Sequence, residues 1–510
     1  MPIDTRNFLN QHLGHYRCAL PRATALVVAV IGKHIVHALV LFIALMPASA
    51  LAALEWDEAK HLLLRTGFVP TPGEIAQLTP LTREQAVDAL LATTRTVART
   101  TPPAFCTIPY ARYRNMQNAE QTMMEEPRDQ QLKMWWYQEM VTTDSPLTER
   151  MVLFWHNHFT SSISKVEDVR LLYEQNALLR RGALGNFALL MRDIDLDPAM
   201  FKYLDKDSNR ANSPNENYAR EVMELFTLGE GQLYGEADIK EAARAFTGYQ
   251  LDSQGRVVAK GDHDPRKKIV LGHEVKTGQD VILQLLLKEE RVATYIAGKF
   301  WSVFVSSPGA NPAANQPDDI AIRQLASVFY QAKYDIRTLL RATLLCDAFW
   351  DLNNRGTLIK SPVEFIIGLT RSLHIPNVNY RNLIGLGKLL GEELFEPPNV
   401  KGWKGGTTWL NCETMLQRWR AVDSLVDSAL KKPDATKKKP PTSKPVFAKK
   451  ADQVRLSPEM WQDTAKEQGA AGITQAINVL LPLPPDEPIQ SPVFANALRA
   501  ILHDSTFHLK

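Results

Sequence analysis

The sequence contains few cysteines, and their spacing excludes the sites that cysteine pairs build. Only four occur in 510 residues, and no two have C-x-x-C spacing, which excludes a thiolate zinc site and an attached c-type haem. Beyond the N-terminal segment remain Cys106, Cys346 and Cys412, of which an oxidising compartment could pair two. So few cysteines do not make a disulfide scaffold.

Several catalytic and nucleotide-binding motifs are also missing. The sequence has no G-x-S-x-G elbow, P-loop, G-x-G-x-x-G turn, EF-hand loop or helical H-E-x-x-H pair. It therefore lacks the local signatures of an α/β-hydrolase, a P-loop nucleotidase, a dinucleotide-binding fold, a calcium loop and a zincin protease. Function has to be argued from less specific clusters of residues.

The first 52 residues differ in composition from the rest of the chain. Four basic residues and one aspartate accompany the apolar run Ala38–Met46, and the small-residue pattern Ala50-Leu51-Ala52 follows. This order predicts a signal peptide over residues 1–52 and a periplasmic or secreted protein. The alternative is an uncleaved N-terminal anchor facing the periplasm. Lys33 interrupts the apolar stretch, however, and neither piece reaches the roughly 20 residues that span a bilayer.

The remaining chain carries no excess charge. Of 59 Lys and Arg and 56 Asp and Glu, 55 of each lie after residue 52. Nucleic acid is therefore not expected as a partner. Residues 431–450, with eight lysines and one aspartate among prolines, predict a disordered insertion. A weak contact of this segment with anionic lipid headgroups is the alternative to a plain linker.

The hydrophobic pattern predicts an all-α fold with irregular loops and little strand. From Leu54 onward apolar residues recur at intervals of three and four, and alternating patterns are scarce. A central helix is expected from Pro214 to Leu228, with Ser213 as N-cap and Gly229 as its stop, and a second helix over 236–247. Positions 249–272 are expected to form a polar loop.

The first candidate site is the pair His156 and His158, at the end of a helix that starts near Pro146 and is apolar on nearly all sides. Side chains at i and i+2 point about 200° apart on a helix, so one metal ion cannot bind both without unwinding. Either histidine could still ligate a divalent metal or act in catalysis. The alternative is a pair of buried neutral imidazoles.

The second candidate is the polar face of the central helix, with Glu221, Glu224 and Arg220 beside Arg244 of the next helix. Carboxylates in a cleft could act as general acid and base or ligate a metal. The alternative is an exposed ladder in which Arg220 pairs with Glu216 and Glu224 at i, i+4 spacing.

Two loops supply the other candidates. In the first, His263 and Asp264 could complete a metal site, and Lys267 could bind an anion, unless the loop is a solvated turn. In the second, Trp403 and Trp409 could stack on a sugar or a partner if exposed, or fill the core if buried. We favour the core.

Many ordered blocks of this sequence resemble the bacterial family catalogued as domain of unknown function 1800. They cover about 55–425 and the tail, and comprise His61–Arg65 with Gly67-Phe68, Glu149–Phe159, Gln175–Phe187, Asp197–Met200, Tyr203–Asp205, Asn215–Gly229, Ala243–Tyr249, His263–Gly272, Lys360–Glu364, Phe395–Gly406 and Leu502–Phe507. The resemblance implies one domain over 53–510, interrupted by the insertion, and an exported helical protein. It also implies a partner related to sulfatases and phosphatases.

Two functions follow as hypotheses. The first is an envelope enzyme, a metal-assisted hydrolase or an oxidoreductase, in which His156 or His158 converges with His263, Asp264 and the two glutamates. The second is a non-catalytic scaffold or maturation partner for an exported sulfatase- or phosphatase-like protein, in which the same charges form structural pairs.

Overall fold

The computed structural model describes residues 52–116, 127–275, 279–307, 317–375, 377–430, 470–491 and 493–510. The chain divides into two compact units, Met1–Ala52 and Ala53–Lys510, and the account below concerns the second. The predicted signal peptide, apart from Ala52, and the insertion 431–450 lie outside the described residues, so both stay predictions.

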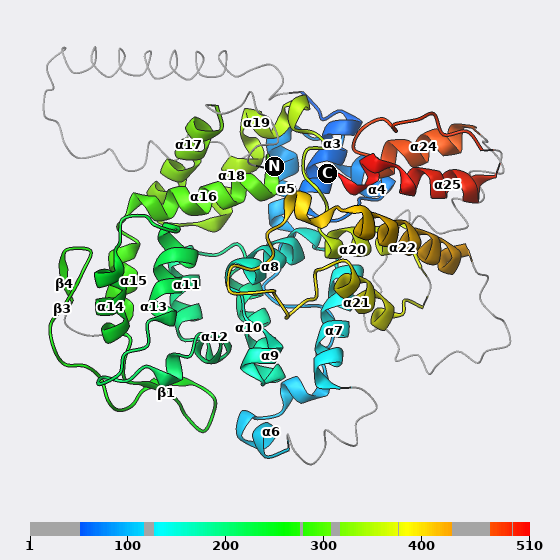
Figure 1. The fold of residues 1–510 in the computed structure, drawn as a ribbon. Helices are drawn as coiled ribbons and strands as arrows, with labels where there is room; N and C mark the ends of the chain where they lie inside the picture. Colours follow the sequence, from blue (N-terminus) through cyan, green and yellow to red (C-terminus); the bar gives the residue numbers. More distant parts are fainter. Residues whose placement is uncertain are drawn as a thin grey trace, which may run out of the picture. The chain divides into compact units, whose positions relative to one another are not determined.

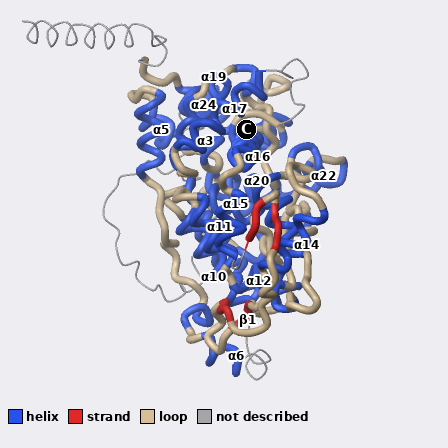
Figure 2. Tube along the Cα trace, turned by 90° about the vertical axis from the view of Figure 1, so that its left-hand side faces the viewer, coloured by secondary structure: helices blue, strands red, loops and turns tan. Residues whose placement is uncertain are grey.

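The second unit is built almost entirely from helices, which confirms the predicted all-α class (Figures 1 and 2). Its α-helices are α3 (Trp56–Thr66), α4 (Pro72–Leu78), α5 (Arg83–Ala92), α6 (Tyr110–Met116), α7 (Arg128–Thr142), α8 (Pro146–His158), α9 (Ile163–Val166), α10 (Val169–Gly182), α11 (Phe187–Asp195), α12 (Pro198–Tyr203), α13 (Asn217–Glu221), α14 (Glu236–Ala245), α15 (Gln279–Leu286), α16 (Glu290–Phe304), α17 (Pro317–Gln331), α18 (Ile336–Leu345), α19 (Asp347–Trp350), α20 (Pro362–Ser372), α21 (Tyr380–Leu389), α22 (Cys412–Leu430), α24 (Ala470–Leu480) and α25 (Phe494–His503). A π-helix, Val222–Leu228, continues α13, and short 3₁₀ turns lie at Ala104–Thr107, Lys206–Ser208, Leu352–Asn354, Gly406–Trp409 and Ser505–His508. Within the described ranges, no helix has the length and apolarity needed to cross a membrane.

Local capping fixes where several helices start. Thr71, Thr82 and Ser361 each accept a hydrogen bond from the backbone three residues on, and the side chains at those positions bond back to the cap. Each such cap stabilises its helix by about 1 kcal/mol. The hydroxyl-x-x-Glu/Gln spacing is readable in the sequence, so these starts follow from local chemistry.

Helix α8 runs through the core, as its apolar pattern predicts. Every residue from Leu147 to His156 is buried, including Glu149. Oε1 of Glu149 accepts a hydrogen bond from Nε of Arg180 at 2.8 Å, and its Oε2 accepts one from the indole of Trp136 at 2.9 Å. The buried carboxylate is thereby paired, which removes most of the cost of burying it.

The expected polar loop after Thr247 was predicted wrongly, because it contains two short hairpins. Strand β1 (Tyr249–Leu251) pairs antiparallel with β2 (Val257–Ala259), and β3 (Lys268–Val270) pairs with β4 (His273–Val275) (Figure 2). The second hairpin turns at Leu271 and Gly272, both with positive φ, as a two-residue hairpin turn requires. Strands of three residues are too short to show an alternating pattern.

The central helix starts three residues later than expected. Ser213 forms a bridge with Arg210, and α13 begins at Asn217. Oδ1 of Asn215 accepts the backbone N–H of Asn217 at 2.9 Å, so an asparagine rather than the serine holds this end. Gly229, with φ of 89°, ends the run at the predicted place.

Candidate functional site

His156 leaves the end of α8 toward the loop that follows α21. Its Nε2 accepts a hydrogen bond from the backbone N–H of Phe395 at 3.2 Å, and the ring lies edge-on to Trp136. Burial lowers the pKa of His156 to about 3. The imidazole is therefore neutral near pH 7 and serves as a buried acceptor, which favours a structural role.

His158 leaves the same helix toward α16 and the π-helix. Its ring lies among aromatic side chains, 4.4 Å from Phe159, 5.9 Å from Phe226 and 6.5 Å from Tyr295 between ring centroids. Burial, and then the charge of Lys299, hold the pKa of His158 well below its usual range. The Phe226 backbone lies nearby, but neither imidazole nitrogen completes a well-formed hydrogen bond with a described residue.

The two histidines thus face different parts of the molecule, as their i, i+2 spacing predicts. The metal hypothesis combines one of these two histidines with His263 and Asp264. Among the residues that the structure describes, no group of three or more His, Cys, Asp or Glu side chains could hold a metal ion.

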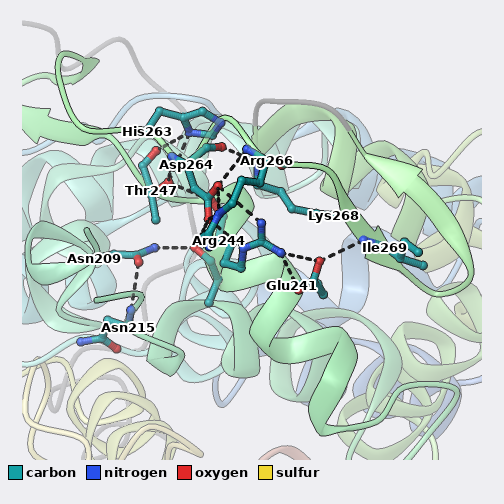
Figure 3. Close-up of polar contacts among 11 residues, drawn as sticks. Asn209, Asn215, Glu241, Arg244, Thr247, His263, Asp264, Arg266, Lys268 and Ile269 are labelled. Carbon is teal, nitrogen blue, oxygen red and sulfur yellow. Dashed lines mark hydrogen bonds and ion pairs between the residues drawn. The ribbon is translucent and has the colours of Figure 1, made fainter. Parts of the chain in front are cut away.

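Asp264 is instead held by arginines from two directions (Figure 3). Nε of Arg244, on α14, donates to its Oδ2 at 2.7 Å, and Nε of Arg266 donates to its Oδ1 at 2.9 Å. The side chain of Asp264 is 1% exposed. Hydrogen bonds from Arg266 and then Arg244 hold the pKa of this carboxyl well below its usual range. Asp264 is therefore a fixed counter-ion.

The neighbours of Asp264 complete a clamp between α14 and β3 (Figure 3). Arg244 also donates to Glu241, which in turn accepts the backbone N–H of Ile269 at 3.1 Å. His263 lies 3.0 Å from the carbonyl of Thr247 through Nδ1. Lys267 points outward to Glu274, at 3.1 Å, with most of its side chain in solvent. These contacts make His263 and Arg244 parts of a structural joint.

The tryptophans of the second loop are buried. Trp403 is 7% exposed and Trp409 is 8% exposed, so neither presents an open face for a sugar. Asn157, between the two histidines, accepts the backbone N–H of Trp403 at 2.7 Å and donates to its carbonyl at 3.2 Å. Their burial favours the core-filling interpretation over a binding role.

The polar face of α13 is only partly the ladder expected from its spacing. Arg220 pairs with Glu216 at 3.2 Å, as expected, but its second partner is Glu236 at the start of α14, at 2.7 Å. The guanidinium of Arg220 therefore has two carboxylate partners. The pair of Arg220 with Glu224 is not formed.

Glu221 is left without a partner on this face. It is half-buried, and no described residue makes a hydrogen bond or ion pair with its carboxylate. Burial, and then the charge of Glu224, raise its pKa to about 7, against smaller opposite effects of Lys401 and Arg220. Lys401 itself pairs with Glu230 at 2.9 Å.

A π-helix follows α13 directly. Its wide turns leave carbonyl groups that need other donors. The hydroxyl of Thr227 donates to the carbonyl of Val222 at 2.6 Å, that of Tyr295 to Leu225 at 3.1 Å, and Nε of Arg291 to Leu228 at 2.8 Å. Two of these donors lie on α16, more than 60 residues away in the sequence. The sequence around residues 222–228 therefore does not predict the π-helix.

The family model described as "Protein of unknown function (DUF1800)" matches residues 61–501. No curated protein and no solved structure matches the chain.

Proposed function

Since the chain belongs to the DUF1800 family, whose reaction is not assigned, we propose from its own residues that it is an exported acid–base enzyme. The unpaired, half-buried carboxyl of Glu221 carries the proposal. A carboxyl group with a pKa near 7 exists in both protonation states at neutral pH, which suits a group that must accept and return a proton. Hydrolysis is the simplest reaction of this class.

The neighbours of Glu221 supply complementary properties. Glu224 keeps the local charge negative and receives only a long hydrogen bond, 3.4 Å, from Tyr234. Lys401 lies close enough to lower the pKa of Glu221, so it could stabilise negative charge on a substrate. In this proposal Glu221 takes a proton from water and delivers it to the leaving group, while Arg220 stays a structural cation.

The test is a screen of the purified chain, without residues 1–52, against chromogenic esters, phosphates, sulfates and glycosides. We expect an activity whose pH profile shows an ionisation near pH 7. Glu221→Gln should lower it at least 100-fold, because general acid–base groups contribute about 10²–10⁴. Glu216→Gln, on the same face but paired with Arg220, is the matched control. An activity that survives in Glu221→Gln contradicts the proposal.

A scaffold role is the second candidate, and the clamp at Asp264 supports it. Asp264, a candidate metal ligand, and Arg244 and Arg220, candidate catalytic residues, all lie in ion pairs. If these pairs serve only the fold, the chain acts by binding an exported sulfatase- or phosphatase-like partner. Stable co-purification of such a protein, undiminished by Glu221→Gln, would favour the scaffold.

A further inference from the structure

Lys206 and Asp195 form an ion pair that solvent does not reach. Asp195 is the last residue of α11, and Lys206 begins the 3₁₀ turn Lys206–Ser208. Nζ of Lys206 donates to Oδ1 of Asp195 at 2.7 Å and to the backbone carbonyl of the same residue at 2.9 Å. Both side chains are 0% exposed. Removing two charges from water is costly even when they are paired.

Aromatic side chains surround this pair. Nζ of Lys206 lies 4.0 Å from the ring centroid of Tyr218 and 5.4 Å from those of Phe246 and Tyr249. The hydroxyl of Tyr218 also donates to Oδ1 of Asp195. Ring faces attract an ammonium, but far less strongly than the water that they replace. Burial accordingly lowers the pKa of Lys206, against the opposite effect of Asp195.

Two other buried lysines are paired differently. Lys133 and Lys510 each contact a carboxylate that a second cation also contacts, and the carboxylate beside Lys133 is 18% exposed. In the part of the chain that the structure describes, Asp195 forms no second ion pair, and its Oδ2 has no hydrogen-bond partner. That oxygen can therefore take up a proton, since no second described cation holds the carboxylate ionised.

We propose that Lys206 and Asp195 condense to an intramolecular amide bond. A proton passes from the ammonium to Oδ2, which gives an amine and a carboxylic acid. The amine nitrogen attacks Cγ, and the carbonyl electron pair moves to Oδ1, where the Tyr218 hydroxyl stabilises the negative charge. As this pair re-forms the carbonyl, the Oδ2 hydroxyl takes a second proton from nitrogen and leaves as water. Ammonium and carboxylate thus give amide and water, with no oxidant or reductant.

Burial favours the amide over the ion pair. In water the hydration of both ions opposes condensation, but these two side chains are out of contact with solvent. The amide replaces two buried charges by one neutral polar group, which is less costly to bury. Exclusion of water also protects the product from hydrolysis. The bond ties the end of α11 to the turn that packs against β1.

The test is mass spectrometry of the purified chain. Its intact mass should be lower than the mass expected from its sequence by one water. After trypsin cuts behind Lys202, residues 193–202 and 203–210 should remain joined as one species, with fragmentation placing the link at Asp195 and Lys206. Lys206→Arg keeps the charge and should have its full expected mass, whereas Asp195→Asn should lose ammonia instead of water.

Separate peptides, with trypsin cutting behind Lys206, overturn the proposal. So does a loss of water that fragmentation places within a single aspartate. Tyr218→Phe should lower the linked fraction, and an unchanged fraction contradicts the role given to that hydroxyl. Lys133 is the internal control and should stay unlinked. If a variant fails to fold, the peptides of the unaltered chain still decide.

This inference does not depend on the proposed role of Glu221. Glu221→Gln should keep the bond between Lys206 and Asp195, and the two proposals can fail separately.

Discussion

The side-chain amide of Asn157 makes two hydrogen bonds to the backbone of Trp403. It accepts the N–H at 2.7 Å and donates to the carbonyl at 3.2 Å. Gly402 precedes that tryptophan with φ of 75°, and a Cβ at this position would collide with the Asn157 side chain. The glycine is therefore required twice, by its backbone angle and by the asparagine. This contact joins the loop to α8.

Asn157→Ala should lower the free energy of unfolding by about 2 kcal/mol, because it leaves two buried backbone groups of Trp403 without partners. Chemical denaturation measures the change. Asn353→Ala, at an exposed position, is the control and should change stability by less than about 0.5 kcal/mol. Equal effects of the two variants would show that the two hydrogen bonds to Trp403 contribute nothing to the free energy of unfolding.

Glu221→Gln should stabilise the protein at alkaline pH. The folded pKa of Glu221, about 7, lies above the unfolded value of about 4.3, so the acid form favours folding and that contribution is lost as pH rises through 7. The uncharged glutamine side chain mimics the protonated form of Glu221. We expect a gain of about 1 kcal/mol at pH 8, allowing for solvent screening of a half-exposed group, and none at pH 4.

The measurement is urea denaturation of both chains at the two pH values. Glu290→Gln, at an exposed position at the start of α16, serves as the control. A Glu221→Gln variant that is less stable than the unaltered chain at pH 8 would mean that the carboxylate has a partner in solution.

Asp264→Asn should loosen the joint between α14 and the hairpins. Its folded pKa is lower than the unfolded value, so the carboxylate contributes stability above about pH 4 and loses it as pH falls further. The variant should lose about 2 kcal/mol at pH 7, as expected for hydrogen bonds to a charged group. Hydrogen exchange over residues 249–275 should rise, whereas exposed Asp262→Asn should leave it unchanged.

Of Cys106, Cys346 and Cys412, only Cys412 should react quickly with a thiol reagent in the folded chain. Cys106 is buried, Cys346 is half-buried and Cys412 is exposed, and none of the three is disulfide-bonded. Burial raises the pKa of Cys346 to about 11, and that of Cys106 still further, which suppresses their thiolates. Maleimide labelling should therefore be fast at one of these three sites, and rapid labelling of Cys106 would indicate that the 3₁₀ turn around it opens readily.

The sequence predicts contacts within one helix better than contacts between distant segments. The opposite directions of His156 and His158 and the pairing of Arg220 with Glu216 follow from helix geometry alone. The second partner of Arg220, Glu236, depends on how α13 and α14 pack. The sequence therefore identifies the polar face as a candidate site. It does not show that Arg220 already has two carboxylate partners or that Glu221 is unpaired.

The four ligand candidates of the metal hypothesis show the same limit of sequence reasoning. Three of these four residues contact different parts of the chain: His156 bonds to the backbone of Phe395, His158 lies against the π-helix, and Asp264 is held by Arg244 and Arg266. Charge and residue type made all of them candidates. Only their packing separates a fixed counter-ion from a reactive group.

The last turn of α8 contacts two separate parts of the chain. Asn157 is hydrogen-bonded to the Trp403 loop. The imidazole of the next residue, His158, packs between α16 and the π-helix. Because close-packed interiors transmit displacement rather than absorb it, a shift of either neighbour moves this helix end. A single helical turn thus connects the Trp403 loop to the rings of Phe226 and Tyr295 that surround His158.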